Sequence, residues 1–418
     1  MAKNNLRYYK TTRLKAVYHL FLRQVAKCWL KLNRQVKVIA VVGSYGKTTT
    51  SQAIYQLLSK ISPTVVSDIN LDTIYNIPLT ILRLRKKHKY LVIEVGVDHK
   101  NEMDFHLNLF TPDLVVFTGI TPVHSDKDLL GSLQGIIKEK EKVVDRLGKN
   151  KWLIANMDNK FVARIAKRHG KKTIYYSMKN NCSEVHAGKI KISKKGTSFA
   201  LNSQKQTLKL SGRFIGSQFV QAIMATAAVG IIEKIPPTKL VGLVKSIKPL
   251  RGRMSLEKGP DQSILINDSL RANPASTKVG LETVSLLKGK RKIAILGEMG
   301  ELGKYKKLEH EKIGRLINSL NFDYIVTVGP LMKLAGKMIK PKKAIVFSAE
   351  NVFGAADFLI NNIKPKKGDI IYLKGSLLKH MERIILIAKG EKVGCNTVSC
   401  PFYNLCPSCR FLKNGYLG

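Results

Sequence analysis

The sequence predicts an α/β fold in two domains, the first built on a mostly parallel sheet and the second Rossmann-like. Short, nearly continuous apolar runs alternate with helix-patterned segments from Lys37 onward, which is typical of strands buried on both faces. The alternation is interrupted at KPLRGR, residues 248–253, and then resumes. The 418 residues are 44% apolar, so the chain is long and apolar enough for two or three domains with cores of their own.

These patterns divide the chain into four parts. We expect a basic amphipathic helical extension at 1–35, a central domain at 36–248, a C-terminal domain at 249–390 and a cysteine-rich tail at 391–418. The strands expected in the central domain are KVIAVVG, KYLVIEVG, DLVVFTGI, KWLIANMD and KTIYYS. Those expected in the second domain are SILINDS, KIAILGEMG, YIVTVG, KAIVFS and DIIYLKGS.

The extension carries an apolar stripe among many Lys and Arg residues. At helical spacing this stripe consists of Leu14, Val17, Tyr18, Phe21, Val25 and Trp29. Such a helix either lies on an anionic membrane surface or packs its stripe on the following domain. Lys and Arg interrupt every apolar stretch before residue 36, so we expect no secretion signal and a cytoplasmic protein, at the inner membrane face if the helix binds lipid.

The net charge of +43 is spread along the whole chain. A field of this sign attracts nucleic acid, anionic lipid or a polyphosphate substrate, or it reflects a lysine-rich composition without a specific partner. The longest uncharged run, Phe214 to Ile232, contains too many polar residues for a membrane span. We expect it to form a buried helix that begins near Gly216.

The stretch VIAVVGSYGKTTTSQAIYQLL, residues 38–58, places a glycine- and threonine-rich turn between a strand and a helix. Backbone N–H groups of such a turn cradle phosphates, while Lys47 neutralises them and the Thr48 hydroxyl binds Mg²⁺. A strict Walker pattern would need glycine where Val41 stands, which indicates a variant P-loop. The sequence therefore predicts ATP and Mg²⁺ as cofactors, with nucleotide contacts from Gly43, Ser44, Tyr45, Gly46, Lys47, Thr48 and Thr49.

Three later segments follow the loop in the same order as three motifs of one known family. IEVGVDHKNEMD at 93–104 resembles the family motif IEMGANHPGEI, and TGITPVHSD at 118–126 is similar to the motif TNIGPAHLE. GSLQGIIKEKEKV at 131–143 resembles a family segment whose second lysine is carbamylated. Together with the loop they resemble the Mur ligases, which join amino acids or peptides to cell-wall precursors with ATP. The resemblance implies a Mg²⁺-binding Glu94, a metal-associated His124 and a carbamylated Lys140, so that catalysis falls to Lys47, Glu94, His124 and Lys140 and metal binding to Thr48, Glu94, His124 and Lys140.

Chemistry alone supports part of this assignment. A carboxylate and a threonine hydroxyl at strand ends beside a P-loop suit the hard cation Mg²⁺. Taken alone, His124 would be predicted as a hydrogen-bonding or structural histidine, because histidine is a poor Mg²⁺ ligand. Lys140, within KEKEK, would be predicted on a solvated helix face. The metal-site roles of these two residues are therefore implied only by the resemblance.

Further motifs resemble the same family. GSQFVQAIMATAA, residues 216–228, resembles an adenine-side helix, with Ser217, Gln218 and Gln221 in place of its histidine and asparagines. RGRMSL makes Arg253 a phosphate contact, and INDSLRANPAS makes Asp268 a nucleotide-contacting carboxylate. INDSLRANPAS, LGEMGELG and YLKGSLLKHME resemble the branch that adds D-alanyl-D-alanine.

The resemblance implies an ATP-dependent amide ligase that forms an acyl phosphate and adds D-alanyl-D-alanine to a muramyl-peptide precursor. An amidating or glutamate-adding member that acts on a lipid-linked or non-UDP substrate stays open, because only the extension precedes Gly43, where the family usually has a UDP-binding domain. A non-catalytic, nucleotide-dependent polyanion-binding protein is the alternative from another class. We expect a monomer whose partners are a cell-wall peptide precursor and a dipeptide or amino-acid amine donor, and not nucleic acid.

The tail CNTVSCPFYNLCPSC gathers four cysteines at C-x4-C-x5-C-x2-C spacing, while Cys28 and Cys182 are isolated. Four thiolates within fifteen residues can enclose a tetrahedral Zn²⁺ ion and so fold a tail too short for its own core. An iron–sulfur cluster or unliganded thiols are the alternatives. The expected zinc ligands are Cys395, Cys400, Cys406 and Cys409.

Overall fold

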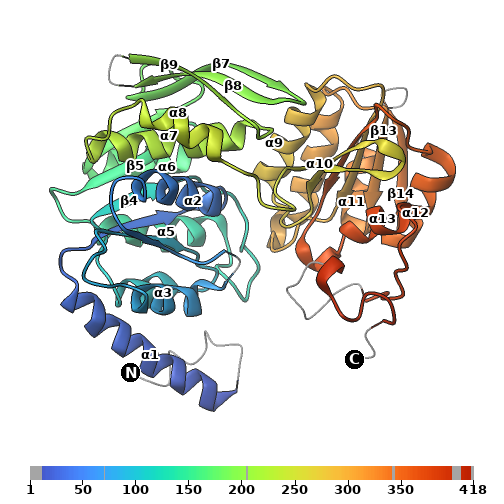
Figure 1. The fold of residues 1–418 in the computed structure, drawn as a ribbon. Coiled ribbons are helices and arrows are strands. Elements are labelled where there is room, and N and C mark those ends of the chain that lie inside the picture. The colour runs from blue at the N-terminus through green and yellow to red at the C-terminus, as the bar shows by residue number, and fades with distance from the viewer. Residues whose placement is uncertain (1–11, 70, 204–205, 341–343, 398–405, 416–418) are drawn as a thin grey trace. The chain divides into compact units, whose positions relative to one another are not determined.

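The computed structural model describes residues 12–415 apart from 70, 204–205, 341–343 and 398–405 (Figure 1). The described chain forms two compact units, which are treated one by one. The first contains the residues up to Lys191, with Ser198–Gly212 and Gln218–Ile247. The second contains Ile192–Thr197, Arg213–Ser217 and the chain from Lys248 on.

The first unit is built on a nine-stranded sheet in the order β2-β3-β1-β4-β5-β6-β7-β8-β9. Every neighbouring pair from β2 to β7 in that order is parallel, which confirms the predicted mostly parallel sheet. The strands are β1 (Lys37–Val42), β2 (Thr64–Val66), β3 (Tyr90–Val95), β4 (Leu114–Phe117), β5 (Trp152–Asn156), β6 (Lys172–Ser177), β7 (Val185–Ser193), β8 (Gly196–Ser203) and β9 (Gln206–Gly212).

Helices connect these strands because parallel neighbours need crossover connections. The connecting helices are α2 (Lys47–Leu58), α3 (Thr73–Leu82), α4 (Glu102–Leu107), α5 (Leu133–Asp145) and α6 (Lys160–His169). Two more helices, α7 (Ser217–Ile232) and α8 (Lys239–Ser246), follow β9. The run from Phe214 to Ile232 forms the buried helix α7, as predicted. Within the described part of the chain, we find no helix with the length and apolar character needed to traverse a bilayer.

The N-terminal helix α1 (Arg13–Leu32) packs on α3 through a face that the sequence analysis did not single out. Ala16 and Ala26 are buried on that face, and the Arg23 guanidinium lies 3.5 Å from the centre of the Phe105 ring. The predicted apolar stripe points away instead: Leu14 is 85% and Phe21 63% exposed. The alternative in which the stripe packs on the following domain is therefore wrong except at Trp29, whose indole donates to Leu84 O.

The second unit contains a six-stranded sheet in the order β10-β11-β15-β12-β13-β14. Only β10 (Ser255–Lys258) runs antiparallel to its neighbour, as expected for a Rossmann-like domain with an added edge strand. The parallel strands are β11 (Ile264–Asp268), β12 (Lys292–Gly297), β13 (Tyr324–Val328), β14 (Ile345–Ala349) and β15 (Ile370–Lys374). The α-helices are α9 (Pro274–Ser285), α10 (Lys306–Ile317), α11 (Pro330–Lys337), α12 (Val352–Phe358) and α13 (Glu382–Ala388).

Chemistry-bearing residues gather at the carboxyl edges of both sheets. In the first sheet, Gly43 follows β1, Gly96 follows β3 and Thr118 follows β4. In the second, Asp268 ends β11 directly beside Lys374, which ends β15. Crevices at the carboxyl ends of parallel strands are the usual ligand sites of open α/β sheets.

Candidate active site

The P-loop starts two residues later than in a strict Walker pattern. Val41 is fully buried in β1, where it pairs with Glu94 of β3 and Val116 of β4. The position that would hold the first Walker glycine is therefore part of the sheet core. The turn runs from Gly43 to Gly46, and α2 begins at Lys47.

The loop is held by the segment that follows β4. The Thr118 hydroxyl is 2.6 Å from Tyr45 O and 3.1 Å from Val42 O, and Ser44 N donates to Gly119 O at 2.7 Å. A Cβ atom on Gly43 would lie 2.1 Å from Thr118 Oγ1, so only glycine fits at this position. The loop and the TGIT sequence thus form one structural element.

The residues expected to contact the nucleotide differ in their exposure to solvent. Gly46 is exposed and has a left-handed backbone at φ 75°, Lys47 is half-buried and Thr48 is buried. The first N–H groups of a helix have no partner within that helix, so the start of α2 offers donors to an anion. The Tyr45 side chain packs closely on Gly119, where a Cβ would lie 2.3 Å from the tyrosine ring, and burial raises the pKa of its phenol.

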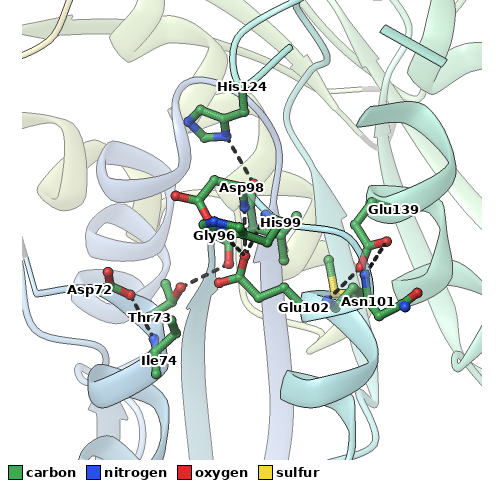
Figure 2. A network of polar contacts seen from close by, with 12 residues as sticks. Asp72, Thr73, Ile74, Gly96, Asp98, His99, Asn101, Glu102, His124 and Glu139 are labelled. Carbon is green, nitrogen blue, oxygen red and sulfur yellow. Dashed lines mark hydrogen bonds and ion pairs between the residues drawn. The ribbon is translucent and has the colours of Figure 1, made fainter. Parts of the chain in front are cut away.

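An acidic and histidine cluster lies just after β3 (Figure 2). Glu102 Oε2 accepts hydrogen bonds from the backbone N–H of Asp98 at 2.8 Å and of His99 at 3.0 Å. Its other oxygen lies 3.4 Å from Nε2 of the buried His106. Burial alone would raise the pKa of Glu102, but these partners outweigh it and lower the pKa to about 2. Glu102 is therefore a fixed anion at neutral pH.

The backbone geometry that forms this cluster comes from α5. Glu139 accepts hydrogen bonds from Asn101 N at 3.0 Å and from Met103 N at 2.8 Å, so it caps the start of α4. Asn101 has the left-handed φ of 62° that places Glu102 under the turn. Asp98, His99 and Glu102 then offer ligand atoms within 4.8 Å of one another.

His124 and Lys140 converge on one carbonyl. His124 Nδ1 lies 3.0 Å from Val97 O, and Lys140 Nζ lies 3.5 Å from the same oxygen (Figure 2 shows His124 above this turn). Since a carbonyl only accepts, His124 donates this hydrogen bond through Nδ1, which fixes the orientation of its ring. The side chain of Lys140 is buried, contrary to the solvated face that its neighbours suggest. Burial and the positive charge of Lys47 lower the pKa of Lys140 to about 7.

Glu94, the remaining residue expected near the metal, is half-buried on β3 beside β1. Its backbone N donates to Ser67 Oγ at 3.0 Å. The structure therefore brings Lys47, His124 and Lys140 together at one edge of the sheet and places Glu94 on the strand that leads to it. Sequence reasoning missed Asp98, His99 and Glu102, although they lie within a segment that carried the resemblance.

In the second unit, Asp268 forms a buried ion pair. Its Oδ2 accepts from Lys374 Nζ at 2.7 Å and from Tyr372 OH at 3.1 Å, and burial raises the pKa of Asp268. Lys374 Nζ also donates to Arg271 O at 2.6 Å. Arg253 is half-buried in this unit, whereas Gln218 is half-buried at the start of α7 in the first. Lys374 is a partner that the sequence analysis did not identify.

The four-thiolate site expected in the cysteine tail stays a prediction, because Cys400 lies outside the described residues. Cys395 and Cys406 are buried, and Cys409 is half-buried. Among the described tail residues, Cys406 joins His380 and Glu382 in a group of potential metal-ligating side chains.

Comparisons with known proteins agree with this architecture. The model of the Mur ligase middle domain matches residues 41–230, and that of the Mur ligase glutamate ligase domain matches residues 252–377. The chain is 28% identical over 369 residues to a UDP-N-acetylmuramoyl-tripeptide–D-alanyl-D-alanine ligase of Buchnera aphidicola, covering 87% of this chain and 79% of that protein. It is 26% identical over 380 residues to the enzyme of the same name from Haemophilus influenzae, covering 90% and 81%.

A crystal structure of MurF from Acinetobacter baumannii superposes with a TM-score of 0.81 at 26% identity, covering 89% of this chain and 81% of that one. A pseudomurein peptide ligase type C from Methanothermus fervidus shares the fold, with a TM-score of 0.67 at 20% identity and coverage of 84% and 78%. The chain thus combines a Mur ligase middle domain with a Mur ligase C-terminal domain and belongs to the Mur ligase family.

Proposed function

We propose that this protein is an ATP-dependent peptide ligase that adds D-alanyl-D-alanine to a muramyl-peptide precursor of the cell wall. The observation that carries the proposal is the meeting of a P-loop lysine, a histidine held through Nδ1 and a buried lysine at one sheet edge. It is supported by relatives of that name that cover most of the chain.

The residues of the loop define the first chemical step. Lys47 and the N–H groups at the start of α2 would bind the β- and γ-phosphates of ATP. A carboxylate oxygen of the precursor attacks the γ-phosphorus, the bond to the ADP oxygen breaks, and an acyl phosphate forms. The amine of the dipeptide then attacks the acyl carbon, loses a proton and expels phosphate. ADP and phosphate are the expected products.

The donor set fits Mg²⁺ if Lys140 is carbamylated. Thr48 and Glu94 supply the oxygen ligands that Mg²⁺ prefers, and His124 presents Nε2. Lys140 as an ammonium ion would not fit, because it would add a second positive charge beside Lys47. As a carbamate it would supply oxygen ligands and a negative charge. When bound, Mg²⁺ neutralises charge on the phosphoryl oxygens.

The environment of Lys140 favours this modification. Its pKa of about 7 leaves much of the amine unprotonated at neutral pH, and only an unprotonated amine can attack the carbon of CO₂. The attack forms an N–C bond and releases one proton from nitrogen. The resulting anion would face Lys47.

A panel of amine donors tests the substrate assignment. With ATP, Mg²⁺ and a muramyl-tripeptide precursor supplied in UDP-linked and lipid-linked forms, we expect D-alanyl-D-alanine to be incorporated at least about a hundredfold faster than glutamate or ammonia. Mass spectrometry of the adduct reads out both donor and acceptor. Preferential use of glutamate or ammonia would contradict the D-alanyl-D-alanine assignment while leaving the ligase chemistry in place.

We further propose that α1 contacts an anionic membrane. Leu14, Phe21 and Leu32 are 85%, 63% and 75% exposed on one stripe, and α1 contains no acidic residue. Ala16 and Ala26 lie buried on the opposite face of α1, which packs against the rest of the first unit. The stripe therefore faces away from the unit. Arg13, Lys15 and Lys31 are also exposed and would contact anionic head groups.

Vesicle co-sedimentation tests this contact. Phe21→Glu should weaken binding to phosphatidylglycerol vesicles at least about tenfold. Burying a phenylalanine side chain in the bilayer contributes about 1.5–3 kcal/mol to the free energy of binding, and the variant lacks this contribution. Leu286→Glu, which alters a residue of similar exposure at 65%, should bind like the wild type. If Phe21→Glu leaves vesicle binding unchanged, the membrane assignment is wrong. It is also wrong if the wild type is a dimer that does not bind vesicles and Phe21→Glu dissociates that dimer.

A further inference from the structure

We propose that His380, Glu382 and Cys406 bind a Zn²⁺ ion that fastens the C-terminal tail to α13. His380 and Glu382 lie at the start of α13, and Cys406 begins the short 3₁₀ turn Cys406–Ser408. The three residues are 1%, 5% and 2% exposed. This site lies in the second unit and contains none of the residues to which we assign the peptide-ligase reaction. It does not depend on the proposed activity.

The ligand atoms have the separations that a tetrahedral ion requires. His380 Nδ1 lies 3.2 Å from Cys406 Sγ and 3.8 Å from Glu382 Oε1, and the three ligand atoms are within 4.8 Å of one another. Around Zn²⁺, with bonds of about 2.0–2.3 Å, neighbouring ligand atoms lie about 3.3–3.8 Å apart. Small side-chain movements therefore suffice to enclose an ion.

Two polar atoms of the cluster lack partners among the described residues. Glu382 Oε1 accepts from Cys406 N at 3.0 Å, while Oε2 is buried without a hydrogen bond, as is His380 Nε2. A buried polar atom without a partner costs about 1–3 kcal/mol. A cation bound by both oxygens of Glu382 would supply the missing interaction for Oε2, while Oε1 is the oxygen that lies 3.8 Å from His380 Nδ1.

Arg383 provides the charge balance. Its Nε donates to Cys406 Sγ at 3.1 Å, and its Nη2 donates to Cys395 Sγ at 3.4 Å. A guanidinium that donates to two sulfurs favours their thiolate forms. Zn²⁺ with two thiolates, the Glu382 carboxylate and the Arg383 cation is electrically neutral. Cys395 lies outside the group of three ligand atoms within 4.8 Å of one another, so it can become the fourth ligand only by moving toward them.

The types of donor atom favour zinc. Zinc binding would replace the proton of each thiol that becomes a ligand. Two buried thiols with an imidazole and a carboxylate suit Zn²⁺ better than an iron–sulfur cluster, which is usually held by four thiolates.

The site explains how a short tail is ordered. The described tail residues Val393, Cys406 and Leu412 form a small apolar cluster with Leu386 of α13. A metal ion that joins Cys406 to α13 adds a cross-link where the apolar area is small. The proposed ligand set takes two residues, His380 and Glu382, from the YLKGSLLKHME segment.

Metal content of the untagged full-length protein tests the proposal. By elemental mass spectrometry after dialysis, we expect about one zinc per chain in the wild type and in Cys28→Ser and Cys182→Ser, which alter exposed cysteines. Cys406→Ser and His380→Phe should lower the zinc content at least about tenfold. Tryptophan fluorescence monitors the first unit, which contains both tryptophans, Trp29 and Trp152.

A ligand exchange separates coordination from folding. His380→Cys should retain zinc, and its Co²⁺ form should show stronger sulfur-to-cobalt charge-transfer absorption than the wild type. Absence of zinc from the wild type, equal zinc in Cys406→Ser, or zinc loss in His380→Cys as complete as in His380→Phe would overturn the assignment.

Discussion

Lys140 gives the prediction that depends most directly on the structure. Its amine is buried among Lys47, Glu102, Asp98 and Glu139, and burial with the Lys47 charge lowers its pKa from 10.5 to about 7. This difference corresponds to about 5 kcal/mol between the two protonation states. Between pH 7 and 10.5 the unfolded chain binds a proton that the folded chain does not, so stability must rise with pH in this window.

Lys140→Met removes the titration and keeps the side-chain length. Integrated between pH 7 and 9, the wild type should gain about 2 kcal/mol of unfolding free energy more than the variant. Urea unfolding followed by tryptophan fluorescence measures this gain in CO₂-free buffer without Mg²⁺ or nucleotide. Lys138→Met, which alters an exposed lysine on the same helix, should keep the wild-type slope.

The same variants test carbamylation. With ¹³C-bicarbonate, the wild type and Lys138→Met should show a carbamate carbon resonance that Lys140→Met lacks. Equal pH slopes in wild type and Lys140→Met would refute the lowered pKa and remove the physical basis for carbamylation at neutral pH.

Three further predictions concern the two sheet edges. Lys47→Met should lower kcat/KM for ATP, measured by steady-state kinetics, at least about a hundredfold through lost charge stabilisation, whereas Lys60→Met, at an exposed position two residues after α2, should not. Gly43→Ala should weaken ATP binding at least about tenfold in a fluorescent-nucleotide titration, because the added Cβ would lie 2.1 Å from a threonine oxygen; unchanged affinity would contradict the described loop. Asp268→Asn should destabilise the second unit by about 3–5 kcal/mol, because it leaves the buried Lys374 without its counter-ion. Adding Lys374→Met should recover part of that loss in amide hydrogen exchange of β15, and a purely additive double variant would argue against the pair.

Strands were the most predictable part of the fold. All ten expected segments form strands, because a strand buried on both faces must be a continuous apolar run. The hairpin strands β7 to β9 were not predicted. Residues 189–193 of β7 alternate between exposed and half-buried, with lysines at two of the exposed positions, so this strand shows polar and apolar alternation instead of a continuous apolar run.

Site residues were predictable where a local motif positions them and not where tertiary contacts do. The P-loop follows from strand, turn and helix signals in one segment. Glu102 depends on the left-handed Asn101 and on a cap from Glu139, which lies 37 residues later in the chain than Glu102. No spacing rule in the sequence contains that contact.

Lys140 did carry a signal that was overlooked. Ile136, Val143 and Val144 are buried on α5, and Lys140 shares their helical face at spacings of three and four residues. A lysine inside an apolar stripe indicates burial, even within KEKEK. In the cysteine tail the four-thiolate set stays a prediction, and no spacing rule in the sequence indicates that His380 and Glu382 offer ligand atoms within 4.8 Å of Cys406.

Isotope transfer from the precursor carboxylate tests the central claim most directly. With both carboxylate oxygens labelled with ¹⁸O, ATP, Mg²⁺ and D-alanyl-D-alanine, ligation through an acyl phosphate must place one ¹⁸O atom in inorganic phosphate for each amide formed, with ADP as the other product. The wild type should show this transfer and Lys47→Met should lose it. Formation of AMP carrying the label, or ligation without any label in phosphate, would contradict the proposed chemistry.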